Sequence, residues 1–204
     1  MFDAEVLLRI SKEAGAPAFR VETTIRLLED GATVPFIARY RKEMTGNLDE
    51  VKIRDIDEGR LYYKDLEERR KTVLDSIEKQ GKLTEDLRQK ILACFNKNEL
   101  EDLYLPYKPK RKTKASVAIE KGLEPLAQYI WEQAGTDPVQ TFAESFVNAE
   151  KQVNSVEEAI EGALHIVAEK VSENADYRKQ LRDRMLAEGM VRARVVKGKE
   201  AEKT

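Results

Sequence analysis

The sequence predicts an all-α protein that contains a helix-turn-helix and a long central helix. Charged residues make up 36% of the 204 residues and apolar residues 41%, a composition typical of helices that bury one face and solvate the other. Glycines, which often end helices in a left-handed conformation, occur at intervals along the chain, at positions 15, 31, 46, 81, 122 and 135. No segment before Gly189 alternates apolar and polar residues as a half-buried strand does.

Starting from these stop signals, we locate helices between the glycines. Capping residues mark several of the starts, and Ser155 with Glu158 forms the clearest capping box. The expected helices cover residues 2–14, 17–30, 33–45, 49–80, 84–96, 98–104, 114–121, 123–134, 138–148, 155–173 and 175–188.

Residues 49–80 form the longest of these helices, about 48 Å at 1.5 Å per residue. Its apolar residues keep heptad spacing, but Gly59 and Arg70 also fall on that seam. We therefore favour a central helix with neighbours on several sides over a two-stranded coiled coil. The expected all-α region, 1–189, comprises a helix-turn-helix over about 17–45, this helix, and a helical subdomain over about 84–189.

The C-terminal residues differ from the rest of the chain. Met190–Val196 alternates apolar and basic residues and runs into a polar tail. Because Gly189 precedes valines that favour strands, we expect a lone extended segment here rather than more helix. We interpret residues 190–204 as the edge of a further domain.

Little in the composition points to an enzyme. One cysteine (Cys94) and one histidine (His165) exclude an internal disulfide and leave no plausible zinc cluster. The sequence contains no phosphate-binding glycine loop and no nucleophile–base arrangement. No apolar run approaches the roughly 18 residues needed to span a bilayer. We expect a cytoplasmic, non-enzymatic protein without a metal or other cofactor.

A first cationic cluster lies on the second helix of the predicted helix-turn-helix. Phe36, Ile37 and Tyr40 are expected to pack inward, which leaves Arg39 and Lys42 outward and Arg41 near the boundary. These cations suit phosphate contacts better than base recognition. The alternative is a helical hairpin whose cations form surface ion pairs.

A second cluster lies in a segment that two prolines keep from being helical. Its cations are Lys108, Lys110, Arg111, Lys112 and Lys114. The preceding Tyr104 and Tyr107 are candidates for stacking on unpaired bases while the cations follow the backbone. In the alternative interpretation the tyrosines hold the loop in place and the cations pair with acids just upstream, which are Glu99, Glu101 and Asp102.

Long strings of the sequence resemble the Tex family of bacterial transcription accessory proteins. They are GATVPFIARYRKEMTGNLDE at 31–50, LEDLYLPYKPKRKTKA at 100–115, GLEPLA at 122–127 and SVEEAIEGA at 155–163. The resemblance implies an all-α N-terminal region, followed in full-length relatives by RNase-H-like, helix-hairpin-helix and S1 domains. It also implies nucleic-acid binding and similarity to a eukaryotic elongation factor that travels with RNA polymerase. It assigns no catalytic residue.

Two classes of function follow from these observations. In the first, the chain associates with DNA or RNA through the two cationic clusters, with little sequence specificity. In the second, it is a scaffold that docks RNA polymerase or downstream domains without touching nucleic acid. The formal net charge of −2 argues against a protein that coats nucleic acid all over, but it leaves room for a local basic patch.

Overall fold

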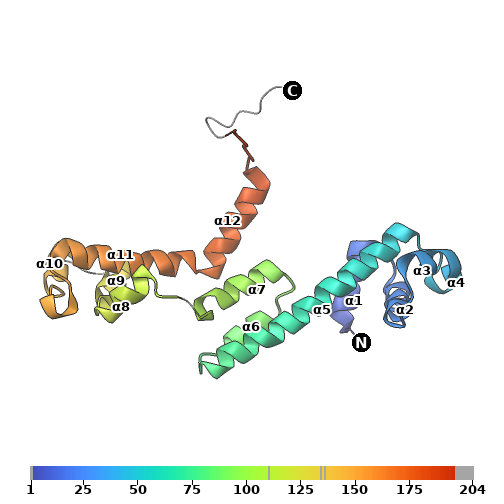
Figure 1. Cartoon of the computed structure of the whole chain (residues 1–204), viewed down its shortest axis with the longest axis horizontal. Helices are drawn as coiled ribbons and strands as arrows, with labels where there is room; N and C mark the ends of the chain where they lie inside the picture. Colours follow the sequence, from blue (N-terminus) through green and yellow to red (C-terminus); the bar gives the residue numbers. More distant parts are fainter. Residues whose placement is uncertain (1, 110, 134, 136, 196–204) are drawn as a thin grey trace. The chain divides into compact units, whose positions relative to one another are not determined.

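The computed structural model describes residues 2–109, 111–133, 135 and 137–195, and it confirms the all-α class. The described residues contain no strand, and an isolated bridge joins Asn148 to Val153. Contacts divide the chain into two compact units, Met1–Leu100 and Glu101–Thr204, which we call the first and second units and describe separately (Figure 1). The subdomain limits expected at residues 84 and 189 stay a prediction.

The first unit is built on the long helix α5. The helices that begin in this unit are α1 Ala4–Ala14, α2 Ala18–Glu29, α3 Val34–Tyr40, α4 Lys42–Thr45, α5 Glu50–Lys79, α6 Glu85–Leu92 and α7 Lys97–Tyr104. The Asp49 side chain caps α5 by accepting a hydrogen bond of 2.8 Å from the Lys52 amide. Helices α1, α2, α3 and α6 pack against α5, which confirms the central helix with several neighbours.

One face of α5 is buried along most of its length. Its buried residues are Ile53, Ile56, Tyr63, Leu66, Arg70, Val73 and Ile77. Gly59 lies on the same helix where α1 approaches, and a Cβ added there would be 3.3 Å from two side-chain carbons of Ile10. The glycine therefore permits the close packing of α1 on α5.

Arg70 is the charged member of the buried face of α5. Its guanidinium donates to the Cys94 carbonyl at 2.8 Å and to the Glu67 carboxylate at 2.7 Å. Since α6 ends at Leu92, Cys94 belongs to the connection that leads into α7. Arg70 thus fixes the position of that connection against α5.

The prediction of a single helix over 33–45 is wrong, because the helix is interrupted at Arg41 and forms α3 and α4. Arg41 has φ −126° and ψ 24°, outside the helical region. After the break, Gly46 ends α4 with φ 66°, and its carbonyl accepts a 2.9 Å hydrogen bond from Arg20 of α2. Thr45 is buried beside it. The change of direction lets α4 dock on α2, and the use of this hairpin as a DNA-binding motif stays a prediction.

The second unit is centred on α11. After the end of α7 it contains η1 Leu105–Tyr107, α8 Lys114–Glu120, α9 Glu124–Glu132, α10 Val139–Glu144, η2 Ala149–Lys151, α11 Val156–Ser172 and α12 Ala175–Glu188. Helices α8, α9 and α10 pack against α11. Their shared core consists of Ala118, Leu123, Leu126, Ala127, Ala143, Val153, Ala159 and Ala163. Its many alanines allow the short helices to approach closely.

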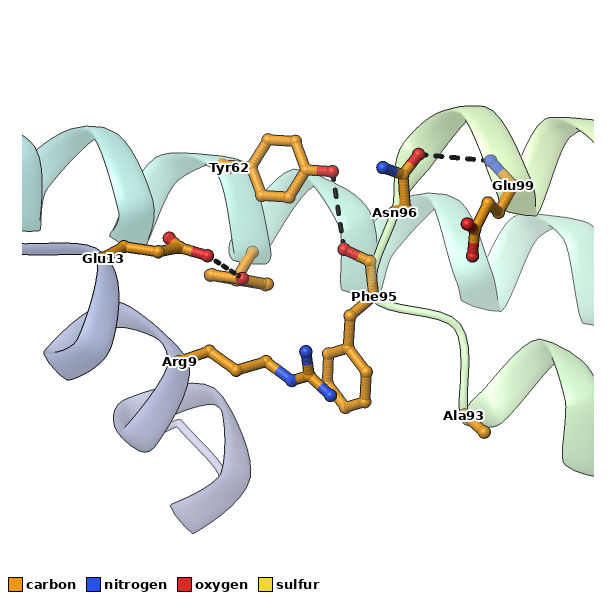
Figure 2. A pocket seen from close by; sticks show the side chains of 8 residues that line it. Arg9, Glu13, Tyr62, Ala93, Phe95, Asn96 and Glu99 are labelled. Carbon is orange, nitrogen blue, oxygen red and sulfur yellow. Dashed lines mark hydrogen bonds between the residues drawn. The ribbon is translucent and has the colours of Figure 1, made fainter. Parts of the chain in front are cut away.

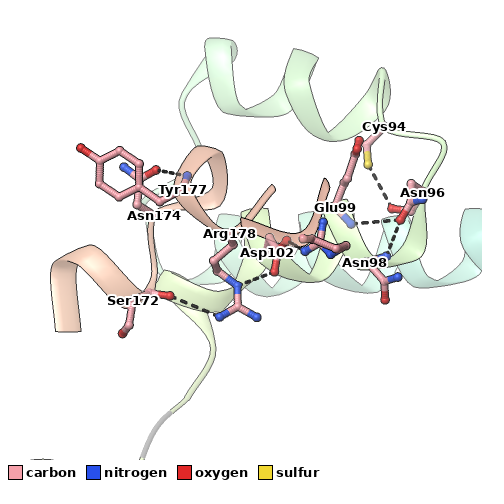
Figure 3. A network of polar contacts seen from close by, with 10 residues as sticks. Cys94, Asn96, Asn98, Glu99, Asp102, Ser172, Asn174, Tyr177 and Arg178 are labelled. Atoms are coloured by element: carbon pink, nitrogen blue, oxygen red, sulfur yellow. Dashed lines mark hydrogen bonds and ion pairs between the residues drawn. The ribbon is translucent and has the colours of Figure 1, made fainter. Parts of the chain in front are cut away.

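Helix α12 is oriented by polar contacts. The Asn174 side chain caps it by accepting from the Tyr177 amide at 3.0 Å. The buried Asp102 carboxylate, at the end of α7, accepts from Arg178 at 2.6 Å (Figure 3). It also accepts from Arg182. The helix ends at Gly189, whose φ of −68° and ψ of 136° are extended. Residues 190–195 are neither helix nor strand, so Gly189 ends the helix as predicted.

We expect Gly162→Ala to lower the free energy of unfolding of the second unit by about 1–2 kcal/mol. A Cβ at this position of α11 would overlap a methyl group of Leu123, which is 1% exposed, and the loss exceeds the roughly 1 kcal/mol that alanine gains in helix propensity. Denaturant unfolding measures the cost of Gly162→Ala in two backgrounds, the wild-type protein and the Leu123→Val variant. An equal cost of Gly162→Ala in both backgrounds would contradict the overlap.

Replacing Asp102 by Asn should loosen α12 while the α8–α11 core stays folded. The change removes the charge that two guanidiniums share and weakens both hydrogen bonds, at a cost of about 2 kcal/mol. Hydrogen exchange should then quicken in residues 175–188. Asp183→Asn, an exposed carboxylate on the same helix, is the control and should leave exchange unchanged. Equal protection of α12 in both variants would show that the Asp102 contacts do not hold it.

Candidate nucleic-acid interface

The basic loop, which we define as residues 108–114, is anchored at both ends. On its N-terminal side Tyr104 is buried and the 3₁₀ turn Leu105–Tyr107 follows. On its C-terminal side Thr113 and Ser116 form a reciprocal capping box at the start of α8, with hydrogen bonds of 3.0 and 2.9 Å. Fixed ends reduce the conformational entropy that the loop would lose on binding a ligand.

The cations of the basic loop face solvent. Lys108, Arg111, Lys112 and Lys114 are exposed, whereas Lys110 lies outside the described residues. Lys112 pairs with Glu120 at 2.8 Å, and because both side chains are largely exposed the pair contributes little stability and is easily exchanged. Across the part of the chain that the structure describes, no ion pair joins Lys108, Arg111 or Lys114 to a carboxylate. These charges are available to an anionic partner.

The tyrosines beside the loop have different positions. Tyr104 is 8% exposed, so the expectation that it stacks on bases is wrong. Its ring anchors the loop. Tyr107 is half-buried in the 3₁₀ turn, and its base contact stays a prediction. Asp102, one of the upstream acids that the alternative interpretation pairs with the loop cations, instead pairs with Arg178 and Arg182.

The other cationic cluster belongs to the first unit. Arg39 lies in α3, Arg41 at the break and Lys42 at the start of α4, and all three are exposed. Phe36 and Tyr40 were expected inward, but they are 39% and 66% exposed, so that expectation is wrong. The break at Arg41 explains it, because Ile37 alone fills the buried side of this short helix.

A pocket of about 530 Å³ in the first unit has no counterpart among the predicted sites (Figure 2). It lies between α1, α5 and the connection from α6 to α7. The Arg9 guanidinium stacks over the Phe95 ring at 3.7 Å. The Tyr63 hydroxyl donates to Glu13 at 2.7 Å, and Tyr62 donates to the Phe95 carbonyl at 3.5 Å. Because these lining residues interact with one another, we interpret the pocket as a junction between structural elements. Sequence patterns did not predict this pocket, and the adjacent aromatic residues Tyr62 and Tyr63 are the feature that could have indicated it.

Among the described side chains, no three His, Cys, Asp or Glu residues are grouped as metal ligands. None of the helices in the described ranges is long and apolar enough to cross a membrane.

Two parts of the chain match known protein families. Residues 4–78 match the family described as "Tex-like protein N-terminal domain", and residues 134–204 match "Tex central region-like". These matches define the class as the helical N-terminal part of a Tex-like protein.

Individual relatives support the same class. The chain is 49% identical over 185 residues to "Uncharacterized protein YdcI" of Bacillus subtilis, covering 91% of the chain and 26% of the relative. It is 47% identical over 193 residues to "Transcriptional accessory protein Tex" of Neisseria gonorrhoeae, covering 95% and 25%. It is 32% identical over 153 residues to the human "S1 RNA-binding domain-containing protein 1", covering 74% and 15%.

The chain belongs to the Tex family. It spans about a quarter of the length of the bacterial relatives that it matches. The resemblance seen in the sequence is thereby confirmed.

The stability of the first unit should fall as the pH rises from about 10 to about 12. Burial, and then the hydrogen bond to the Glu13 carboxylate, raise the pKa of Tyr63 from 10.0 to about 12. The stabilisation is therefore complete below pH 10, the unfolded value, and is lost as Tyr63 ionises in the folded state. Urea unfolding of the protein and of Tyr63→Phe across this range measures the difference between the two, which should shrink.

A matched control for this measurement is Tyr177→Phe, which alters an exposed tyrosine of the second unit. It should leave the alkaline loss of stability in place. If the free energies of unfolding of the wild-type protein and Tyr63→Phe change in parallel from pH 9 to pH 12, the environment of Tyr63 does not contribute to the alkaline loss of stability.

Proposed function

We propose that the chain is a non-catalytic module of a transcription accessory factor and associates with nucleic acid through phosphate contacts of the basic loop. The observation that carries the proposal is the display of Lys108, Arg111, Lys112 and Lys114 on a segment fixed by Tyr104 and by the Thr113–Ser116 capping box. Arg39, Arg41 and Lys42 form a secondary phosphate contact.

The chemistry of the loop favours backbone contact over sequence recognition. Lysine and arginine side chains on an irregular segment interact with phosphate charge wherever it is presented. Base recognition in duplex DNA usually places a helix or a β-ribbon in the major groove. A short turn followed by the seven residues of α8 offers no such reading element at the loop itself. The proposed association is therefore sequence-tolerant.

The names of the relatives support the same proposal. One relative is called a transcriptional accessory protein and another an S1 RNA-binding domain-containing protein. We extend transcription and nucleic-acid association to this chain on that basis.

A second candidate function is docking to RNA polymerase or to further domains of a longer protein. It is favoured by the surface of α12, where Tyr177, Leu181 and Met185 follow at four-residue spacing and are all exposed. Residues spaced by four lie on one face of a helix. This role needs no nucleic acid, and a protein partner would cover the apolar face.

A salt series separates the two functions. Fluorescently labelled single- and double-stranded DNA and RNA should bind the chain at 50 mM salt. If five cations neutralise five phosphates of a duplex, the slope of log K against log salt is about −4.5, a loss of about 500-fold between 50 and 200 mM. Replacing Lys108, Lys110, Arg111, Lys112 and Lys114 by Gln should abolish most of the binding and of this slope.

The control removes the same amount of charge elsewhere. Lys12, Arg26, Lys71, Lys79 and Lys82 are exposed cations outside both clusters, and their replacement by Gln should cost far less affinity. If the two variants with five substitutions each lose the same affinity, the effect is explained by net charge alone. Absence of binding to every probe at low salt would reject the nucleic-acid function and leave docking as the favoured one.

A further inference from the structure

The aromatic residues of α3 form an exposed pair. Phe36 and Tyr40 are one helical turn apart, and their ring centroids are 5.3 Å apart with an interplanar angle of 48°. Phe36 is 39% exposed and Tyr40 66% exposed. Large apolar rings that remain open to water on a surface often mark a binding site.

Cations surround the pair. The Arg41 guanidinium lies 5.2 Å from the centre of the Phe36 ring, and its Nη1 donates to the Tyr40 carbonyl at 3.4 Å. Arg39 and Lys42 are exposed on either side of the break, together with one carboxylate, Glu43. Within residues 34–45, three positive charges against one negative charge favour contact with an anion.

The backbone break sets up this arrangement. Because Arg41 leaves the helical conformation, its side chain lies against Phe36 and is held near the rings. Ile37, on the adjacent face of α3, is fully buried in the core. The rings and cations are thus held on a buried anchor, which lowers the entropy lost when a ligand binds.

We propose that Phe36 and Tyr40 are a stacking platform for unpaired bases of single-stranded nucleic acid, with Arg39, Arg41 and Lys42 holding the adjacent phosphates. The inference rests on the proposed function, and it places base contacts on α3 in addition to the contact predicted for Tyr107 beside the basic loop. Exposed aromatic rings beside cations are the means by which proteins hold single strands without sequence preference. A duplex hides its base faces, so the platform discriminates against it.

The test compares ring variants with ring-preserving ones in the complete 204-residue chain. Binding of labelled 20-nucleotide single strands, oligo(dT) and oligo(rU), and of a 20-base-pair duplex is measured by anisotropy at several salt concentrations. Tyr40→Leu and the pair Phe36→Leu with Tyr40→Leu keep apolar bulk but remove the rings. They should weaken single-strand binding by about ten- to a hundredfold, with an unchanged salt slope and unchanged duplex binding.

Matched controls exclude indirect effects. Tyr40→Phe keeps the ring and should bind as the wild-type protein does. Phe19→Leu removes an exposed ring of α2 and should leave affinity unchanged. Since Tyr40 is the more exposed of the two rings, the single Tyr40→Leu variant should keep the helical circular dichroism spectrum even if the double variant does not.

A second measurement observes the platform directly. With Trp131, the single tryptophan, changed to Phe, Tyr40→Trp places one fluorophore in α3. Stacking on a base should quench its emission when a single strand is added, whereas a duplex should not.

The outcomes separate this inference from the proposed function. Salt-dependent binding that requires the basic loop but is unaffected by the ring variants, with no quenching at position 40, overturns the platform and leaves the proposed function intact. Absence of binding to every probe overturns both. Loss of single-strand affinity in Tyr40→Leu, together with full affinity in Tyr40→Phe, supports the platform.

Discussion

The need to cover one buried face of α5 determines the arrangement of the first unit. That face runs from Ile53 to Ile77, and α1, α2, α3 and α6 all pack on this helix. Gly59 allows α1 to come close, and Arg70 ties the connection after α6 to the same helix. Because α3 contributes a single fully buried side chain, Ile37, to this packing, its remaining surface is left to other uses. The exposed aromatic pair is a consequence of how little of α3 the core requires.

Much of the fold was predictable because its helix ends depend on local chemistry. Gly15, Gly31, Gly46, Gly81 and Gly122 all have positive φ, as expected for left-handed helix ends. Gly135 is different, because Gln133 takes the left-handed conformation and ends α9 two residues earlier. A Cβ on Gly135 would overlap the Tyr129 ring. That glycine serves close packing, which a stop signal in the sequence does not distinguish from capping.

The features that sequence patterns missed depend on contacts between distant residues. Nothing local to 33–45 marks Arg41 as a break, because the break is favoured by docking of Gly46 on Arg20, 26 residues earlier in the chain. The partners of Asp102, Arg178 and Arg182, lie 76 and 80 residues further along the chain, so no local pattern indicates them. Periodicity identifies which residues share a face, but not which element that face meets. The charges of the candidate site could therefore be identified in the sequence, whereas the burial of Tyr104 and the exposure of Phe36 and Tyr40 could not.

The exposed position of the basic loop also makes this segment accessible to proteases. Exposed, non-helical segments are the preferred sites of proteolytic nicking, and residues 111–113 are non-helical with Arg111 and Lys112 facing solvent. Trypsin cleaves after such residues, whereas Pro109 protects the bond after Lys108. A cut in this segment would separate residues that precede it, including all of the first unit, from helices α8–α12. A bound polyanion would cover the same bonds, so the rate of cleavage reports directly on occupancy of the loop.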